Sequence, residues 1–335
     1  IAFRPKGFID ASVFTVPKTA GGHPRLVLGG LAALVVGGSA LAAVVTARPE
    51  SLHAAFASAA APRPPVQVVE DLPLLAERLR DSRFMGGVLV AQGDRVLFRQ
   101  IYGKADYQND IPLTLETRFR LASVSKQFTA AAILKLQDEG VLDVRDPVCK
   151  WIQPCPEAWA PVRIHHLLSH TSGIPDLMAR PGWGARRITP ATLDQLTEDS
   201  KLYRLQFVPG TKVRYDNAAF NLAAAIVEKA SGKPYEVYLR EALFKPLGMT
   251  ETGLGDASNL ARGYANFPGG LAAQDNANVS IVIGAGAAYS TLDDMLAWQR
   301  ALHHGRVLTP DGYAQMVADH APAEAHERGR AKDRL

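Results

Sequence analysis

The sequence predicts an α+β fold on three observations. A composition of 47% hydrophobic and 21% charged residues over 335 positions is that of a globular chain that can bury a core. An early segment, residues 87–98, has the sequence pattern of two strands joined by a turn, which predicts a β-hairpin. Later segments repeat their apolar residues with the period of buried helices. The 37 basic residues, set against 33 acidic ones, are scattered and form no run that could follow a phosphate backbone, so nucleic-acid binding is not expected.

Each element has its own local signal. Residues 68–80 have the pattern of a short amphipathic helix that precedes the hairpin. Residues 123–139 form a second predicted helix, with apolar positions dense enough for burial, and Gly140 ends it. Another amphipathic helix begins at Leu292.

The N-terminal region, residues 1–65, has the features of an export or anchor segment followed by a linker. Residues 26–45 carry no charge, and a helix of this length, at about 1.5 Å per residue, would cross a hydrocarbon core of about 30 Å. Basic residues precede it, which predicts that the remainder lies outside the cytoplasm. Residues 40–42 and 57–59 both resemble signal peptidase sites, so a cleaved signal peptide and a retained transmembrane anchor stay open. A periplasmic or extracellular protein, anchored or secreted, is expected.

Two cysteines, Cys149 and Cys155, lie six positions apart in a turn-rich segment. Because thiols oxidise outside the cytoplasm, a local disulfide is the preferred interpretation, and it would stabilise the fold by about 2 kcal/mol. The alternative is two free thiols, because one possible pairing is no proof of it.

The chemistry-bearing pattern is Ser123 with Lys126, three residues later on the same helical face. A serine hydroxyl becomes a strong nucleophile only when a base takes its proton, and a desolvated lysine can be that base. Ser123 also opens the predicted helix, whose unpaired N–H groups favour a nearby oxyanion. The alternative is an ordinary N-cap serine with a solvated lysine.

Five segments give this pattern its context. They are residues 119–130, with Ser123-Val124-Ser125-Lys126; residues 166–175, with His170-Thr171-Ser172-Gly173; residues 207–217, with Tyr215-Asp216-Asn217; residues 245–250; and residues 289–295. Together, and in this order, they resemble the serine β-lactamase-related family, which includes class C β-lactamases, D-alanyl-D-alanine carboxypeptidases and esterases. The resemblance runs from about residue 72 to residue 315.

The resemblance implies a β-lactamase/transpeptidase-like fold, in which an antiparallel sheet is flanked by helices and joined to an all-helical region. The hydrolase domain would occupy residues 66–315 and a polar tail residues 316–335. Tyr215 would shuttle the proton with Lys126, and Asn217 would bind substrate and orient the lysine. Which of Lys126 and Tyr215 is the base stays open.

The family's chemistry is acyl transfer through an acyl-enzyme, on a β-lactam, a D-alanyl cell-wall peptide or an ester. A second Tyr-x-Asn match at Tyr107 lies in a polar loop and is interpreted as turn chemistry. His170 and Ser172 could suggest a Ser-His pair, but the glycines of a nucleophile elbow are missing, so a structural role for His170 is preferred. No metal-ligand spacing or nucleotide-binding loop is found, so no cofactor is predicted.

One family landmark is not found. The family carries a third motif, Lys-Thr-Gly or His-x-Gly, on a late strand beside the cleft, and the nearest match, at His303, ends the helix from Leu292 as a cap would. A sheet incomplete at its C-terminal end, from a truncated or frameshifted product, is therefore expected. Three functions stay open: an active serine hydrolase, an inactive penicillin-binding or interaction protein, and a structural membrane-anchored domain. The oligomeric state is not predicted.

Overall fold

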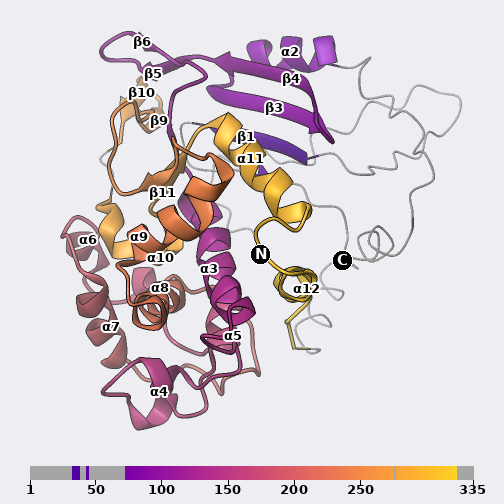
Figure 1. The fold of residues 1–335 in the computed structure, drawn as a ribbon. Coiled ribbons are helices and arrows are strands. Elements are labelled where there is room, and N and C mark those ends of the chain that lie inside the picture. Colours follow the sequence, from indigo (N-terminus) through magenta and orange to yellow (C-terminus); the bar gives the residue numbers. More distant parts are fainter. Residues whose placement is uncertain (1–31, 38–42, 45–71, 275–276, 323–335) are drawn as a thin grey trace, which may run out of the picture.

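A computed structural model describes residues 32–37, 43–44, 72–274 and 277–322 (Figure 1). An antiparallel sheet lies at one end of the molecule and a group of helices at the other, with helix α3 (Lys126–Asp138) running between them. Helices α2 (Leu72–Asp81) and α11 (Leu292–His303) contact the sheet. The predicted α+β class, with an antiparallel sheet flanked by helices and an added helical region, is confirmed.

The predicted hairpin is formed by β3 (Gly86–Gln92) and β4 (Arg95–Tyr102), which pair antiparallel. Because successive side chains of a strand point to opposite faces, β3 serves two layers. Val88 and Val90 pack with α2 in a small separate cluster, whereas Leu89 belongs to the main core. A Cβ on Gly87 would lie 2.6 Å from Leu292 Cδ1, so this position leaves room for α11.

The apolar N-terminal stretch corrects one prediction. Where residues 26–45 are described they form β1 (Ala32–Gly37) and β2 (Ala43–Val44), not one continuous helix. β1 pairs antiparallel with β3 along its whole length, giving the sheet order β2-β1-β3-β4. A short apolar run rich in valine and glycine fits a buried strand as well as a helix, and the available edge of β3 decides between them. Among the described residues, no helix combines the length and apolar character needed to cross a membrane.

The helical region is built around α3 and α8 (Ala218–Ser231), which pack against each other. The predicted helix over residues 123–139 is confirmed, except that its first turn is a 3-10 turn, η3 (Ala122–Ser125). Phe128 of α3 is fully buried, with ring centroids 5.1 Å from Phe244 and 4.7 Å from Trp298. Ten of the residues of α8 are buried, because its many alanines let neighbouring backbones approach closely.

The other elements complete this frame. Further helices are α4 (Val148–Trp151), α5 (Ile164–Leu168), η5 (Leu177–Ala179), α6 (Trp183–Arg186), α7 (Leu193–Lys201), α9 (Tyr235–Leu239), η8 (Val279–Val282), α10 (Ile283–Gly286) and α12 (Pro310–Val317). A three-stranded sheet has the order β7 (Phe119–Arg120), β11 (Ala288–Ser290), β8 (Gly253–Leu254). Two small hairpins are β5 (Lys104–Asp106) with β6 (Ile111–Pro112), and β9 (Tyr264–Phe267) with β10 (Gly270–Ala273).

The C-terminal part of the described chain is helical. α11 ends at His303, with His304 as its C-cap and Gly305 at φ 69°, so the His-His-Gly segment is a helix end, as predicted. The His303 ring contacts Tyr313 of α12 and Gln299 of its own helix. Within residues 277–322 no strand follows β11. The rest of the predicted tail, the linker and both predicted signal peptidase sites lie outside the described residues.

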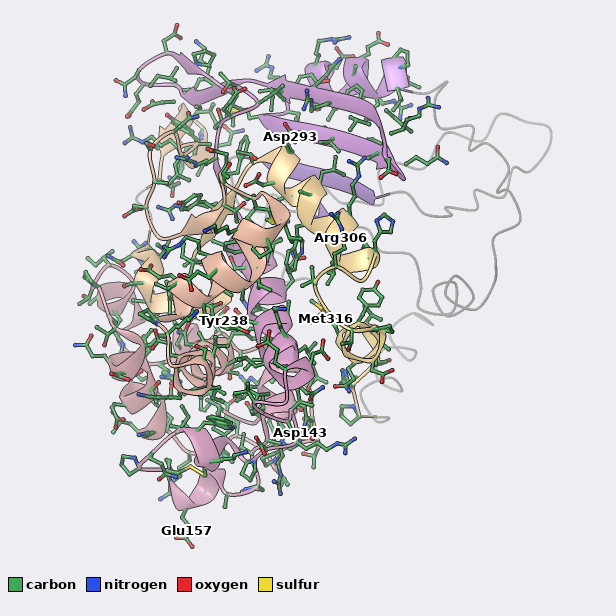
Figure 2. All side chains as sticks on the ribbon, in the orientation of Figure 1. Asp143, Glu157, Tyr238, Asp293, Arg306 and Met316 are labelled. Atoms are coloured by element: carbon green, nitrogen blue, oxygen red, sulfur yellow. A yellow bond between two sulfur atoms is a disulfide. The ribbon has the colours of Figure 1, made fainter. Side chains whose placement is uncertain are left out.

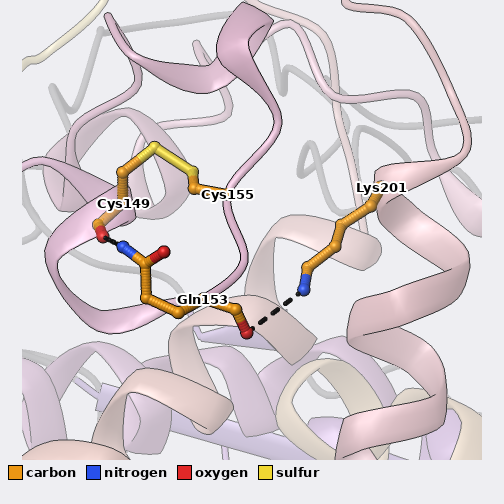
Figure 3. The surroundings of a disulfide bond; sticks show 4 residues. All are labelled: Cys149, Gln153, Cys155 and Lys201. Atoms are coloured by element: carbon orange, nitrogen blue, oxygen red, sulfur yellow. Dashed lines mark hydrogen bonds between the residues drawn. A yellow bond between two sulfur atoms is a disulfide. The ribbon is translucent and has the colours of Figure 1, made fainter.

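A disulfide joins Cys149 and Cys155, with their Cα atoms 5.3 Å apart, and the predicted pairing is therefore present in the structure. Figure 3 shows one hydrogen bond within the loop, from the Gln153 side-chain amide to the Cys149 carbonyl, and one from outside it, from Lys201 Nζ to the Gln153 carbonyl at 3.4 Å. Figure 2 places this loop near Glu157, at the end of the helical region remote from the sheet. The bond stabilises a part of the fold away from the sheet.

Candidate active site

The nucleophile candidate lies in the 3-10 turn that leads into α3. Ser123 is exposed, and the residue before it, Ala122, has the left-handed φ of 45°. β11 holds this turn from both sides: Leu121 N donates to the Ala288 carbonyl at 2.8 Å, and Ala288 N donates to Ser125 Oγ at 3.0 Å. The turn therefore presents the Ser123 hydroxyl to solvent while its neighbours are held in the core.

Lys126 lies one turn further, buried under Ser123. Its Nζ donates to Ser123 Oγ at 3.2 Å, to Asn217 Oδ1 at 2.8 Å and to the Ala285 carbonyl at 2.8 Å. Burial lowers the pKa of Lys126 to about 8, against the opposing effect of nearby carboxylates. A lysine with this pKa is partly neutral near physiological pH and can accept a proton.

Tyr215 comes from the loop before α8, and its hydroxyl reaches Ser123. The two hydroxyl oxygens lie 2.5 Å apart, and Lys126 Nζ lies 4.7 Å from the centre of the Tyr215 ring. Desolvation raises the pKa of Tyr215, while its hydrogen bond with Ser123 acts in the other direction. The Ser123 hydroxyl is therefore contacted by both Lys126 and Tyr215, the two residues that the sequence predicted as its partners.

Asn217, the N-cap residue of α8, accepts a hydrogen bond from Lys126. It is 4% exposed, and Asp176 Oδ1 accepts both its backbone N–H, at 2.9 Å, and its side-chain Nδ2, at 3.0 Å. The sequence interpretation missed Asp176, although it directly follows the Ile174-Pro175 pair that ended the quoted segment. The only signal was an acidic residue next to a family landmark.

Asp216 and His170 form a layer beneath Tyr215. Asp216 is 1% exposed and its carboxylate accepts the N–H groups of Ala218 and Ala219 at the start of α8. Burial raises the pKa of Asp216 to about 7. The His170 ring lies 4.6 Å from the Tyr215 ring, and its Nδ1 accepts Asp216 N–H at 3.2 Å.

These contacts give His170 a structural position. Burial lowers the pKa of His170 to about 4, so at neutral pH it is an uncharged ring that supports Tyr215. No hydrogen bond between His170 and either Ser123 or Ser172 is found in the described residues. The preference for a structural His170 over a Ser-His pair is consistent with this geometry.

Ala285 supplies a contact that no side-chain pattern could reveal, because Lys126 uses its backbone carbonyl. α10 reaches this place through Gly284, where a Cβ would lie 2.2 Å from the Phe220 carbonyl oxygen and 2.7 Å from Ala224 Cβ. Asn221 also binds this segment, accepting Gly284 N–H at 3.1 Å. Only glycine allows α10 to approach α8 so closely.

Other candidates lie apart from this site. The second Tyr-x-Asn match is a turn in which Asp106 accepts the backbone N–H groups of Gln108 and Asn109, as predicted. The disulfide lies in the distal loop described above. Among the described residues, no group of three or more His, Cys, Asp and Glu side chains could hold a metal ion.

The fold is of the β-lactamase/transpeptidase-like class, and Ser123, Lys126 and Tyr215 meet within it. Comparison with known proteins identifies the family. The family model described as "Beta-lactamase" matches residues 74–333, and the chain belongs to this family. The boundaries proposed for the hydrolase domain, residues 66–315, stay a prediction.

Several relatives illustrate the range of the family. The chain is 36% identical over 186 residues to penicillin-binding protein 4* of Bacillus subtilis, covering 54% of this chain and 40% of that protein. It is 30% identical over 239 residues to the D-alanyl-D-alanine-carboxypeptidase/endopeptidase AmpH of Escherichia coli, covering 68% and 60%. Esterase EstB of Burkholderia gladioli is 34% identical over 192 residues, covering 53% and 49%. The chain therefore spans less than two thirds of the length of each of these relatives.

A solved structure supports the same assignment. The penicillin-binding protein from Bacillus halodurans superposes with a TM-score of 0.64 at 30% sequence identity, covering 73% of this chain and 77% of that one.

Proposed function

We propose that this chain is a serine hydrolase that works through an acyl-enzyme on Ser123. The observation that carries the proposal is the pair of contacts at one hydroxyl, Tyr215 Oη at 2.5 Å and Lys126 Nζ at 3.2 Å. Two titratable groups next to an exposed serine can take its proton as it attacks and return it to the leaving group.

The reaction has two halves. Ser123 Oγ attacks a carbonyl carbon of the substrate, and the serine proton passes to the Lys126–Tyr215 pair. The attack converts the carbonyl into a tetrahedral oxyanion. Collapse breaks the bond to the leaving group, which takes the proton, and leaves an ester on Ser123. Water then attacks this ester, the pair again carries the proton, and Ser123 is released with a free acid as product. The proton is assigned to the pair, because both groups lie within hydrogen-bond distance of the Ser123 hydroxyl.

The proposed substrates are a β-lactam, a D-alanyl cell-wall peptide or a simple ester. Relatives named as penicillin-binding protein, D-alanyl-D-alanine-carboxypeptidase/endopeptidase and esterase support this range. All three substrate classes contain a carbonyl carbon with a leaving group, which nucleophilic attack by Ser123 requires.

The test is covalent labelling. Wild type and Ser123→Ala are incubated with fluorescent penicillin, with Ser231→Ala, which changes the half-buried last residue of α8, as the matched control. The proposal expects label on wild type and on the control but not on Ser123→Ala. Turnover of nitrocefin and p-nitrophenyl esters then separates a hydrolase from a penicillin-binding protein that acylates without turnover. A wild type with neither label nor turnover would contradict both the hydrolase and the penicillin-binding protein.

We also propose that the protein works outside the cytoplasm, on the periplasmic or extracellular side. The Cys149–Cys155 disulfide supports this, because such bonds persist in oxidising compartments. Cell fractionation should recover the protein in the exported fraction, where thiol alkylation should modify neither cysteine until a reductant is added. Recovery in the cytoplasmic fraction with both thiols free would contradict the proposal.

A further inference from the structure

Asp176 is the least expected charge near the active site. It precedes η5 and is not one of the groups that contact Ser123 or Lys126 directly. Its Oδ1 instead accepts two hydrogen bonds from a single residue, Asn217, one from the backbone and one from the side chain. A contact of this kind fixes both the position and the rotation of the asparagine.

The rotation matters because the two ends of an amide are chemically opposite. A carboxylate only accepts hydrogen bonds, so it selects the Nδ2 end of Asn217 and turns Oδ1 away. Oδ1 then faces Lys126 Nζ at 2.8 Å, where an acceptor is needed. A reversed amide would place its NH₂ against the lysine amine and its oxygen against the carboxylate, which are two unfavourable contacts.

The charge of Asp176 acts on the same lysine. Lys126 Nζ contacts Ser123 of η3 and the Ala285 carbonyl of α10. Tyr215 and Asn217, which lie just before α8, approach the same amine. The charged or titratable groups around it are Asp176, Asp216 and the neutral His170, with Arg180 acting on Asp216. Of these, Asp176 makes the largest contribution that holds the pKa of Lys126 up against burial.

We propose that Asp176 is a positioning residue of the active site, which holds the Asn217 amide in the one orientation that keeps the Lys126 amine beside Ser123. The inference rests on the proposed function and deepens it. It requires nothing of Asp176 at the reacting atoms, because its effect passes through Asn217.

Two substitutions separate geometry from charge. Asp176→Asn removes the charge but keeps one oxygen that can accept both Asn217 hydrogen bonds, whereas Asp176→Ala removes the acceptor. We expect kcat for an ester substrate to fall by about 10²-fold in Asp176→Ala and by less than about tenfold in Asp176→Asn, with KM nearly unchanged in both, because a misplaced catalytic group lowers the rate more than binding. Equal losses in the two variants, or a loss confined to KM, would overturn the proposal.

A matched control accounts for the loss of an acidic side chain as such. Asp194 is an exposed aspartate of α7 that pairs with Lys229 at 4.0 Å, away from the site. Asp194→Asn should keep wild-type kcat and KM. Thermal unfolding of each variant identifies any loss of the fold, and the comparison of kcat is made among variants that unfold like the wild type.

A second readout needs no turnover. NMR titration of the Lys126 amine should give a midpoint about one pH unit lower in Asp176→Asn than in wild type, because a neighbouring negative charge is lost. Asp216 becomes easier to ionise in that variant and acts in the opposite direction, so the same change is measured in an Asp216→Asn background, where the fall should be at least as large. The Asn217 side-chain amide should also exchange faster with solvent in Asp176→Ala.

These measurements separate two failures. Unchanged Lys126 midpoints and unchanged Asn217 exchange in all variants would overturn the role of Asp176, whatever the activity. A wild type without label or turnover would instead count against the proposed hydrolase, and the NMR results would still decide whether Asp176 positions the lysine through Asn217.

Discussion

Lys126 Nζ lies 2.8 Å from the backbone carbonyl of Ala285, a residue 159 positions further along the chain. This contact depends on the close approach of α10 to α8 at Gly284. It joins the predicted nucleophile helix to a segment without any catalytic pattern. The site is therefore a product of helix packing as much as of its motifs.

Gly284→Ala should destabilise the protein by about 1–3 kcal/mol, because its Cβ would lie 2.2 Å from the Phe220 carbonyl oxygen in a packed interior. Urea unfolding followed by circular dichroism measures this change. Gly184→Ala is the matched control, since the added Cβ would meet nothing within 4 Å in α6. Equal unfolding free energies for the two variants would contradict the packing argument.

Tyr215→Phe should lower the rate of Ser123 acylation by about 10²–10⁴-fold, because the hydroxyl that shares the proton is lost while the ring can still stack on His170. Stopped-flow labelling with fluorescent penicillin gives the rate. Tyr107→Phe serves as control, because Tyr107 belongs to the turn that only resembles the motif. A normal rate in Tyr215→Phe would leave Lys126 as the sole base.

The acylation rate should rise with pH through about 8. The pKa of Lys126 is lowered to about 8, and only the deprotonated amine accepts a proton, so the active fraction grows as pH increases through that value. A pH series of kcat/KM measures this limb. Lys126→Met should abolish both the limb and the activity. A rate that falls across this range would show that the protonated lysine is the working form.

Asp216 should make stability depend on pH in a defined direction. Its folded pKa is raised to about 7 from 3.8, so between these values the unfolded chain has released a proton that the folded protein keeps. The unfolding free energy contributed by Asp216 therefore falls as pH rises from about 4 to about 7. Relative to wild type, Asp216→Asn should become more stable across this window in urea titrations. Parallel curves for the two proteins would refute the assignment.

Removing the disulfide should cost about 2 kcal/mol of unfolding free energy, the chain-entropy value for so short a loop. Cys149→Ser combined with Cys155→Ser is compared with wild type by thermal unfolding, with and without reductant. Reductant should lower the stability of wild type and leave the double variant unchanged. Acylation of Ser123 should persist in the folded variant, because neither cysteine takes part in the hydrogen bonds of Ser123, Lys126 and Tyr215.

Much of this molecule was predictable from local pattern. The hairpin of β3 and β4 and the helix that begins beside Ser123 follow from periodicity and glycine stops, which act over a few residues. The order of the motifs predicted that Tyr215 and Asn217 belong with Lys126. The structure brings these residues together, and their catalytic roles stay predictions that the variants above can test.

The errors share one physical cause. Residues 26–45 suit a membrane helix by composition, yet β1 pairs with β3 because an open strand edge offers backbone partners that no local signal encodes. Asp176 was missed for a similar reason, since its importance comes from a contact with Asn217, 41 positions away.

Residue types at short spacings were enough to identify the family, the nucleophile candidate and the residues that could carry its proton. The burial of Lys126, the carbonyl that it binds and the carboxylates that surround it depend instead on tertiary contacts. Burial and charge are properties of neighbours distant in the chain, and they set the pKa on which the proposed chemistry depends.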